Sequence, residues 1–167
     1  MDVELKSIGE DAVPRLADIF YGCLQRDYID VLPQEVLSGF TLQESISLWS
    51  KSFAGQESSK FIGAWSGDQL LGFAKFGQDP ENARNGYLAS LYVDPSQSGK
   101  GVGRLLLAHV LQALSLYSQT RLWVFSNNPR AIKLYESLGF SLSGRTRVEA
   151  EWKVLQSEMV LNNAKPD

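Results

Sequence analysis

Three glycines at alternate positions in residues 99–103 constrain this chain more than any other feature of the sequence. The residues before them, 87–93, are aromatic and apolar and predict a strand that ends at Asp94-Pro95. The residues after them, 105–114, have the pattern of a helix. Glycines let the backbone approach a ligand closely, and successive N–H groups that lead into a helix attract an anion. The segment therefore predicts a strand, a phosphate-binding turn and a helix.

The spacing of these glycines excludes two common phosphate-binding loops. A P-loop requires a glycine five residues before Gly99 and a serine or threonine after Lys100, but Asp94 and Gly101 stand there. A dinucleotide-binding loop that started at Gly101 would need its third glycine at Leu106. On the glycines alone, a connector that binds no ligand stays open as an alternative.

The length and composition indicate one globular domain, which we place at residues 1–161, followed by a frayed tail at 162–167. The net charge of −3 argues against a broad nucleic-acid-binding surface and suits a cationic amine as substrate. Cys23 and His109 are the only cysteine and histidine, so we expect no intrachain disulfide and no metal site. No apolar run approaches the roughly 18 residues of a membrane span, and the first residues are charged, so we expect a cytoplasmic protein without a membrane partner.

Hydrophobic periodicity predicts the element order β, α, α, β, β, β, α, β, α, β, β. Thr41 and Glu44 have the spacing of a capping box in the second helical stretch. The expected elements are strands at 3–8, 61–65, 70–76, 87–93, 121–125, 140–146 and 152–161, and helices at 12–28, 34–39 with 42–53, 105–114 and 129–138. This order predicts an α/β (α+β) domain with a mixed sheet and helices on both faces.

Two segments resemble the signatures of the GNAT superfamily of N-acetyltransferases. Residues 93–103 are similar to its coenzyme A loop, Gln/Arg-x-x-Gly-x-Gly/Ala, in which Gly101 and Gly103 occupy the two small positions. Ser98 departs from this pattern because glutamine or arginine is usual there. Residues 128–140 resemble the second signature, Asn-x-x-Ala-x-x-hydrophobic-Tyr-Glu-x-x-Gly-Phe. The element order is also that of this fold, so the resemblance covers nearly the whole chain.

The resemblance implies a mostly antiparallel sheet of about seven strands and transfer of an acetyl group from acetyl-CoA, as cosubstrate, to a primary amine. It implies that the strands ending at Val93 and Phe125 splay apart, so that backbone groups of Leu91 and Val93 can bind the pantetheine arm as a further strand would. The cofactor-binding residues that it indicates are Leu91, Tyr92, Val93, Ser98, Gly99, Lys100, Gly101, Val102, Gly103, Arg104, Asn128 and Tyr135.

Tyr135 is the candidate catalytic residue. In the family its hydroxyl would donate a proton to the thiolate that leaves during acyl transfer. The residues alone also allow a core tyrosine whose hydroxyl bonds to a carbonyl, since Ala131, Leu134, Tyr135 and Leu138 share one helix face. Asn128 would bind pantetheine, cap the helix that starts at Pro129, or do both.

The sequence leaves the general base open. Relatives often carry a glutamate early in the fourth strand, but Tyr87 stands near that place. Asp79 and Glu81 in the preceding loop are candidates, with solvated loop charges as the alternative. Cys23 lies on the apolar stripe of the first helix, so we interpret it as a core residue and not as a nucleophile.

Two segments are expected to select the acceptor: residues 28–33 and the loop around 147–151. Arg145 and Arg147 would pair with an acceptor carboxylate or be solvated. The acceptor is a small-molecule or peptide amine, which leaves protein N-termini, lysines, polyamines, amino acids and aminoglycosides open, and the protein is a monomer or homodimer. The alternative function is an acyl-CoA-binding sensor of the same fold without turnover.

Overall fold

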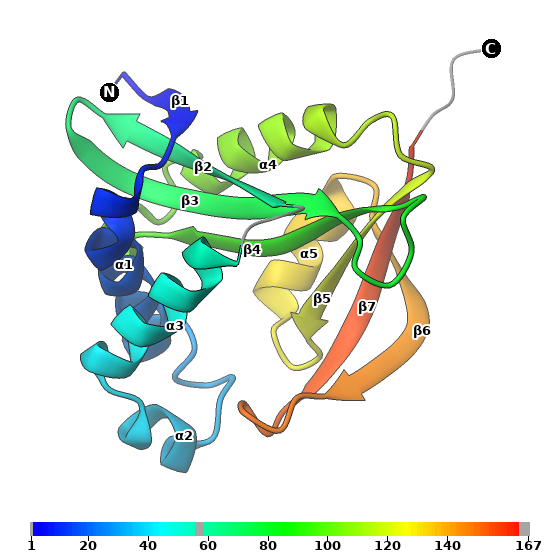
Figure 1. Ribbon diagram of the computed structural model, residues 1–167. Helices are drawn as coiled ribbons and strands as arrows, with labels where there is room; N and C mark the ends of the chain where they lie inside the picture. The colour runs from blue at the N-terminus through cyan, green and yellow to red at the C-terminus, as the bar shows by residue number, and fades with distance from the viewer. Residues whose placement is uncertain (1, 56–58, 164–167) are drawn as a thin grey trace.

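The computed structural model of the chain describes residues 2–55 and 59–163. Its element order confirms the predicted fold class (Figure 1). In chain order the elements are β1 (Glu4–Ser7), a 3₁₀ turn η1 (Glu10–Ala12), α1 (Val13–Arg26), α2 (Gln34–Gly39), α3 (Leu42–Ala54), β2 (Ser59–Ser66), β3 (Gln69–Gln78), β4 (Gly86–Val93), a 3₁₀ turn η2 (Pro95–Gln97), α4 (Val102–Ala113), β5 (Gln119–Phe125), α5 (Pro129–Ser137), β6 (Ser141–Val148) and β7 (Leu155–Asn162).

The strands form one seven-stranded sheet in the order β1-β2-β3-β4-β5-β7-β6. Every neighbouring pair is antiparallel except β4 and β5, which run parallel. Side chains alternate between the two faces along β3, so Phe73 packs under α1 and α3 while Ala74 packs under α4. Helices α1 to α3 cover one face, and α4 and α5 cover the other (Figure 1).

The first helices form because their apolar residues return once per turn and face the sheet. Helix α1 buries a stripe that includes Leu16, Ile19, Phe20 and Leu24, each at most 2% exposed. Full burial of such a side chain contributes about 1.5–3 kcal/mol, so this stripe holds α1 on the sheet. Thr41 and Glu44 make the predicted capping box at the start of α3.

The parallel pair in the middle of the sheet is short, and this creates the site. Residues 86–88 of β4 pair with residues 120–122 of β5, and beyond them the two strands separate. A register shift in the β3–β4 pairing leaves Ala89 as an extra residue on β4. A bulge of this kind bends a strand and increases its twist, which directs the end of β4 away from β5. The predicted splay is therefore present.

The C-terminal part differs from the expectation in two places. Strand β7 begins at Leu155 and not at Trp152, because Trp152 is buried in the turn before it, against Phe20 and Phe40. The frayed tail was expected from residue 162, but β7 extends to that position, and Asn163 Nδ2 donates to the carbonyls of the α4–β5 connection at 2.9 and 3.1 Å. The remainder of the expected tail, residues 164–167, lies outside the described residues.

Candidate active site

The glycine-rich turn has the backbone conformation of an anion-binding loop. Gly99 and Gly101 have φ angles of +78° and +85°, in the left-handed region that favours glycine. Helix α4 begins directly after Gly101, and the first N–H groups of a helix have no acceptor within that helix. These N–H groups and the positive end of the helix dipole suit a pyrophosphate.

Asp94 anchors the start of this turn. Its side chain accepts hydrogen bonds from the backbone N–H and the hydroxyl of Ser96, both at 2.9 Å. Its other oxygen pairs with Arg15 of α1 at 2.5 Å. Burial on its own would raise the pKa of Asp94, but the hydrogen bonds from Ser96 and Arg15 outweigh it and hold the pKa below its usual value. Because Arg15 neutralises this carboxylate, the turn does not present it to an incoming phosphate as a free negative charge.

A cavity of about 520 Å³ lies between the turn, the end of β4 and the start of α5. The structure brings together there all but one of the residues that the sequence indicated for the cofactor. The exception is Lys100, which is exposed and does not line the cavity. Its backbone N–H donates to the Gln97 carbonyl at 3.3 Å. The predicted residues that line it are Leu91, Tyr92, Val93, Ser98, Gly99, Gly101, Val102, Gly103, Arg104, Asn128 and Tyr135.

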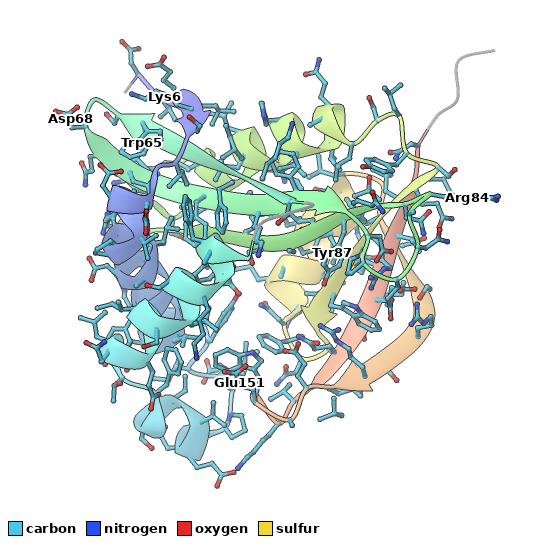
Figure 2. The ribbon with its side chains drawn as sticks, in the orientation of Figure 1. Lys6, Trp65, Asp68, Arg84, Tyr87 and Glu151 are labelled. Carbon is cyan, nitrogen blue, oxygen red and sulfur yellow. The ribbon has the colours of Figure 1, made fainter. Side chains whose placement is uncertain are left out.

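A second cavity of about 300 Å³ lies on the other side of the gap between β4 and β5. Figure 2 shows two of its lining residues, Tyr87 of β4 and, lower in that view, Glu151 of the β6–β7 loop. Aromatic rings of the first core cluster, among them Trp49 and Trp152, form part of its wall. The two cavities meet, since six residues line both: Tyr28, Leu91, Tyr92, Asn128, Ala131 and Tyr135. We infer that the first cavity suits a phosphate group at its loop end and that the second, the acceptor cavity, suits an acceptor.

Tyr135 lies where the two cavities meet. Its ring packs edge-on against Phe140 at 5.8 Å between centroids, and its helix face lies against the second core cluster, as predicted. Burial raises the pKa of the Tyr135 phenol to about 12. The hydroxyl therefore keeps its proton through the physiological range and is available as a donor.

The free edge of β4 offers backbone groups to the same place. The N–H of Asp94 bonds to the carbonyl of Leu71 in β3. Strand residues alternate in direction, so the backbone groups of Leu91 and Val93 point away from β3, toward the gap. The Val93 carbonyl already accepts a hydrogen bond from the Cys23 thiol at 3.1 Å. This leaves the second lone pair of that oxygen and the N–H groups for a ligand.

Asn128 caps helix α5, because its side-chain oxygen accepts from the N–H of Ala131 at 3.2 Å. The helix-cap alternative of the sequence analysis is therefore confirmed. The same side chain lines both cavities, and its amide nitrogen remains able to donate to a ligand.

Cys23 is a buried structural thiol, 3% exposed, as predicted. Burial raises the pKa of the Cys23 thiol to about 12, with a further contribution from the charge of Asp27. Because the thiolate is the reactive form, we expect the native protein to resist iodoacetamide at pH 8 and to be alkylated rapidly in urea. Mass spectrometry of the two samples measures this difference, and rapid labelling of the native protein would contradict it.

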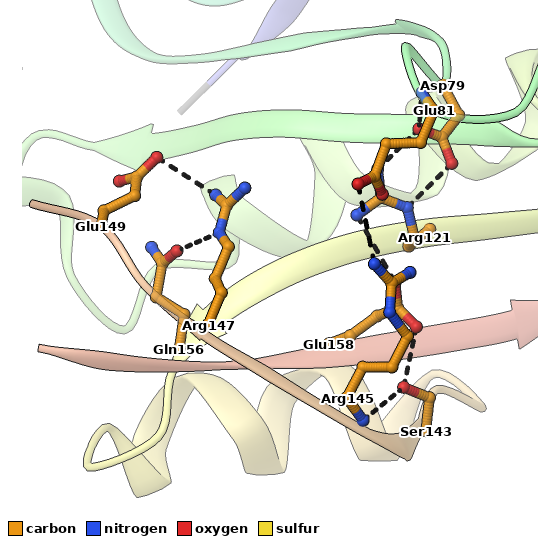
Figure 3. Close-up of polar contacts among 9 residues, drawn as sticks. All are labelled: Asp79, Glu81, Arg121, Ser143, Arg145, Arg147, Glu149, Gln156 and Glu158. Carbon is orange, nitrogen blue, oxygen red and sulfur yellow. Dashed lines mark hydrogen bonds and ion pairs between the residues drawn. The ribbon is translucent and has the colours of Figure 1, made fainter.

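The structure corrects the expectation that Asp79 is a solvated loop charge, whereas Glu81 is exposed, as the alternative for a loop charge predicts. Asp79 is 2% exposed and takes a two-pronged contact from Arg121 of β5, at 2.6 and 2.8 Å (Figure 3). Glu81 pairs with Arg121 at 3.1 Å and with Arg145 at 3.6 Å. Neither carboxylate lines the acceptor cavity. Both therefore belong to a structural ion cluster and are not placed to act as the base.

Arg145 and Arg147, which were expected to bind an acceptor carboxylate or to be solvated, both have partners on the sheet (Figure 3). Arg145 donates to Glu158 at 2.8 Å, outside the acceptor cavity. Arg147 lines that cavity, donates to Gln156 at 2.6 Å and pairs with Glu149 at 3.2 Å. Its guanidinium also lies 4.4 Å from the centroid of the Trp123 ring.

Eight residues that line the first cavity were not assigned to the cofactor from the sequence: Cys23, Asp27, Tyr28, Asp94, Gln97, Arg130, Ala131 and Leu134. Arg130 occupies an unspecified position of the second signature, two residues after Asn128. The sequence did place Arg130 in the first turn of a helix, and this was a sign that it could bind an anion. The structure adds that the first turns of α4 and α5 line the same cavity. Tyr28 was expected to affect the acceptor and proves to line both cavities.

A sequence model of the acetyltransferase (GNAT) family matches residues 21–140. The chain belongs to this family. It is thus an acetyl-CoA-dependent N-acetyltransferase, as its two motifs predict. The loop and the cavity described above fit the phosphates and the pantetheine arm of that cosubstrate.

Similar proteins differ in the amine that their names specify. The spermine/spermidine N(1)-acetyltransferase of Bacillus subtilis is 28% identical over 95% of this chain and 100% of its own length. The alanine N-acetyltransferase of ribosomal protein bS18 from Salmonella typhimurium is 34% identical over 56% of this chain and 64% of its own. The PaiA N-acetyltransferase of Thermoplasma acidophilum, solved in complex with coenzyme A, shares the fold with a TM-score of 0.75 at 17% identity, over 97% of this chain and 99% of that one.

Within residues 2–55 and 59–163, none of the helices has the length and apolar character that a membrane span requires. In the same part of the chain, no three or more histidine, cysteine, aspartate or glutamate side chains are grouped so that they could hold a metal ion.

Proposed function

We propose that the acceptor of this N-acetyltransferase is a polyamine or a similar flexible polycation. The observation that carries the proposal is the lining of the second cavity, which includes Glu149 and Glu151 together with several aromatic rings and Tyr135. Carboxylates and aromatic faces both attract ammonium groups. The printed name of the B. subtilis relative, which matches along nearly all of this chain, supports the same class of acceptor.

In the proposed reaction the amine nitrogen attacks the thioester carbon, the carbon–sulfur bond breaks, and coenzyme A leaves as a thiolate. The Tyr135 hydroxyl donates its proton to that sulfur. The free N–H groups of β4 stabilise the negative charge that develops on the carbonyl oxygen. The attacking amine must lose a proton, and Glu149 and Glu151 are the carboxylates among the described residues of the acceptor cavity that can accept it, directly or through water. Glu149 is paired with Arg147, so Glu151 is the first candidate.

Removing both carboxylates tests the acceptor class. For Glu149→Gln/Glu151→Gln we expect kcat/KM to fall about 10-fold more with spermidine than with hexylamine, equivalent to about 1.4 kcal/mol. Loss of the proton acceptor lowers both values, but hexylamine has no second ammonium group to bind. Thiol release from acetyl-CoA, measured with a panel of amines, gives both values.

Glu10→Gln is the matched control, since Glu10 is exposed and lines neither cavity. Equal losses with both amines would assign the carboxylates to proton transfer alone. Turnover of amino acids but not of spermidine, abolished by Arg147→Gln, would replace the polyamine with an acceptor that bears a carboxylate.

A further inference from the structure

A side chain of α5 crosses to the coenzyme A loop. Nη2 of Arg130 donates to the hydroxyl oxygen of Ser98 at 2.6 Å, although the two residues are 32 positions apart in the chain. Arg130 is in the first turn of α5, and Ser98 is just before Gly99 in the loop. Both residues line the cavity that receives the cosubstrate.

The contact holds a positive charge at the phosphate-binding end of that cavity. Within residues 2–55 and 59–163, no carboxylate lies within ion-pair distance of Arg130 or of the neighbouring Arg104. The carboxylate at the start of the loop, Asp94, is already paired with Arg15. The charge of Arg130 is therefore available to an anion, and Ser98 uses one of its five N–H donors.

Ser98 is also the position at which the loop departs from the family pattern. A serine side chain has neither the charge of arginine nor the amide of glutamine, and it is shorter than both. Its contact with Arg130 positions a guanidinium beside the same point of the loop.

We propose that Arg130 binds a phosphate group of acetyl-CoA and that Ser98 orients it, so that this pair replaces the side chain usually present at position 98. The inference rests on the binding of acetyl-CoA and not on the identity of the acceptor. A guanidinium suits this role because it can offer two parallel N–H donors to phosphate oxygens. Arg130 and Tyr135 lie on one helix, so the phosphate contact and the proposed proton donor are fixed relative to each other.

Calorimetric titration of the full chain with coenzyme A, 3′-dephospho-coenzyme A and pantetheine tests the proposal. We expect Arg130→Ala to weaken coenzyme A binding about 10-fold, the size of one charge-assisted hydrogen bond lost at an exposed site. Pantetheine, which has no phosphate, should bind the variant as it binds the wild type. A loss seen with coenzyme A alone would locate the contact at the 3′-phosphate, and a loss with both nucleotides would locate it at the pyrophosphate.

Three further variants separate phosphate binding from structural damage. Lys133→Ala removes a charge from the next turn of α5, outside the cavity, and should leave the affinity unchanged. Arg130→Lys should lose less affinity than Arg130→Ala, because it keeps the charge. Ser98→Arg in the Arg130→Ala background should restore coenzyme A affinity by providing the usual residue of the family.

Unchanged coenzyme A affinity in Arg130→Ala would overturn the proposal. It would also fail if pantetheine affinity fell by the same factor, since the role would then be structural. If the wild-type chain bound no coenzyme A, the acetyl-CoA-dependent function itself would be wrong. That outcome differs from one in which the wild type and Arg130→Ala bind coenzyme A equally well, which contradicts only the role of Arg130.

Discussion

Replacing Tyr135 with phenylalanine is expected to lower kcat on the order of 100-fold, at the lower end of the range for loss of a general acid. The variant keeps the ring and its contact with Phe140, so the core of α5 should be unchanged. It removes the one group on α5 that can protonate the leaving thiolate where the two cavities meet. Because the contacts of the loop with the phosphates are not altered, the Kd for coenzyme A should change little. Steady-state thiol release and calorimetry measure the two quantities.

Two other tyrosines make this prediction specific. Tyr117→Phe is the matched control, since Tyr117 is a partly buried tyrosine that packs on the same core cluster and lines neither cavity. Tyr28 lines both cavities, and burial raises its pKa well above the usual value, so it is the rival donor. If Tyr28→Phe lost the activity and Tyr135→Phe kept it, the proton donor would be Tyr28. If all three variants remained active, neither Tyr135 nor Tyr28 would be the required proton donor.

The burial of Tyr135 also predicts how kcat/KM depends on pH. The pKa of Tyr135 is raised to about 12, so it stays protonated, and a proton donor, up to about that pH. An acceptor ammonium group has to lose its proton, with a pKa near 10.4 for a lysine-like amine. We therefore expect kcat/KM to rise from pH 6 to 9 without a basic limb from Tyr135. A fall between pH 8 and 10 in the wild type that Tyr135→Phe lacks would contradict this assignment.

The parts of the site that could be predicted are those written in continuous sequence. The glycines of the loop need positive φ angles, and Asn128 followed by Pro129 begins a helix, so both structures follow from local chemistry. The fold followed from periodicity and the family resemblance together. The separation of β4 from β5 was predicted only from the family resemblance, because no residue in either strand indicates where the parallel pairing ends.

The parts that could not be predicted depend on pairs of residues far apart in the chain. Arg130 and Ser98 are separated by 32 positions, and Arg121 and Asp79 by 42. A charged residue in a polar loop is usually solvated, so Asp79 gave no sign that Arg121 would bury it. Such contacts become visible only when the sheet brings β5 beside the loop between β3 and β4.

The buried pair of Asp79 and Arg121 is expected to give the largest effect on stability. The Asp79 side chain is 1% exposed and that of Arg121 is 5% exposed. Asp79→Ala would leave the buried guanidinium without its two-pronged partner, with Glu81 at 3.1 Å and Glu158 at 3.5 Å as its remaining carboxylates. Because these two compensate part of the charge, we expect a loss of about 3 kcal/mol, at the lower end of the usual range. For a chain of this size the melting temperature should fall by roughly 6–12 °C. Differential scanning calorimetry and urea denaturation at pH 7 measure both.

Asp79→Ala should also disturb the acceptor cavity. The Arg121 guanidinium lies 4.6 Å from the centroid of the Tyr87 ring and 5.6 Å from that of Trp123, and both rings line this cavity. An Arg121 side chain freed from Asp79 would no longer support these rings. We expect the KM for the amine to rise in Asp79→Ala while the Kd for coenzyme A stays the same, because the ion cluster does not line the first cavity.

At acid pH the contribution of Asp79 to the stability of the fold should be lost. Burial alone would raise the pKa of Asp79, but hydrogen bonds from Arg121 and from the Glu81 N–H outweigh it and lower the pKa in the folded state. As the pH falls below the unfolded value of about 3.9, the unfolded chain gains the proton first. The stabilisation is therefore complete at neutral pH and is lost as the pH falls through the lowered folded pKa. The gap in unfolding free energy between the wild type and Asp79→Asn should narrow below pH 4.

Glu81→Ala distinguishes the buried pair from the exposed part of the cluster. Glu81 also contacts Arg121, at 3.1 Å, but its side chain is 53% exposed. An ion pair with so exposed a partner contributes at most about 1 kcal/mol, so this variant should unfold within a few degrees of the wild type. Equal losses in Glu81→Ala and Asp79→Ala, or a gap between the wild type and Asp79→Asn that does not change between pH 7 and pH 3.5, would show that burial does not set the strength of this pair.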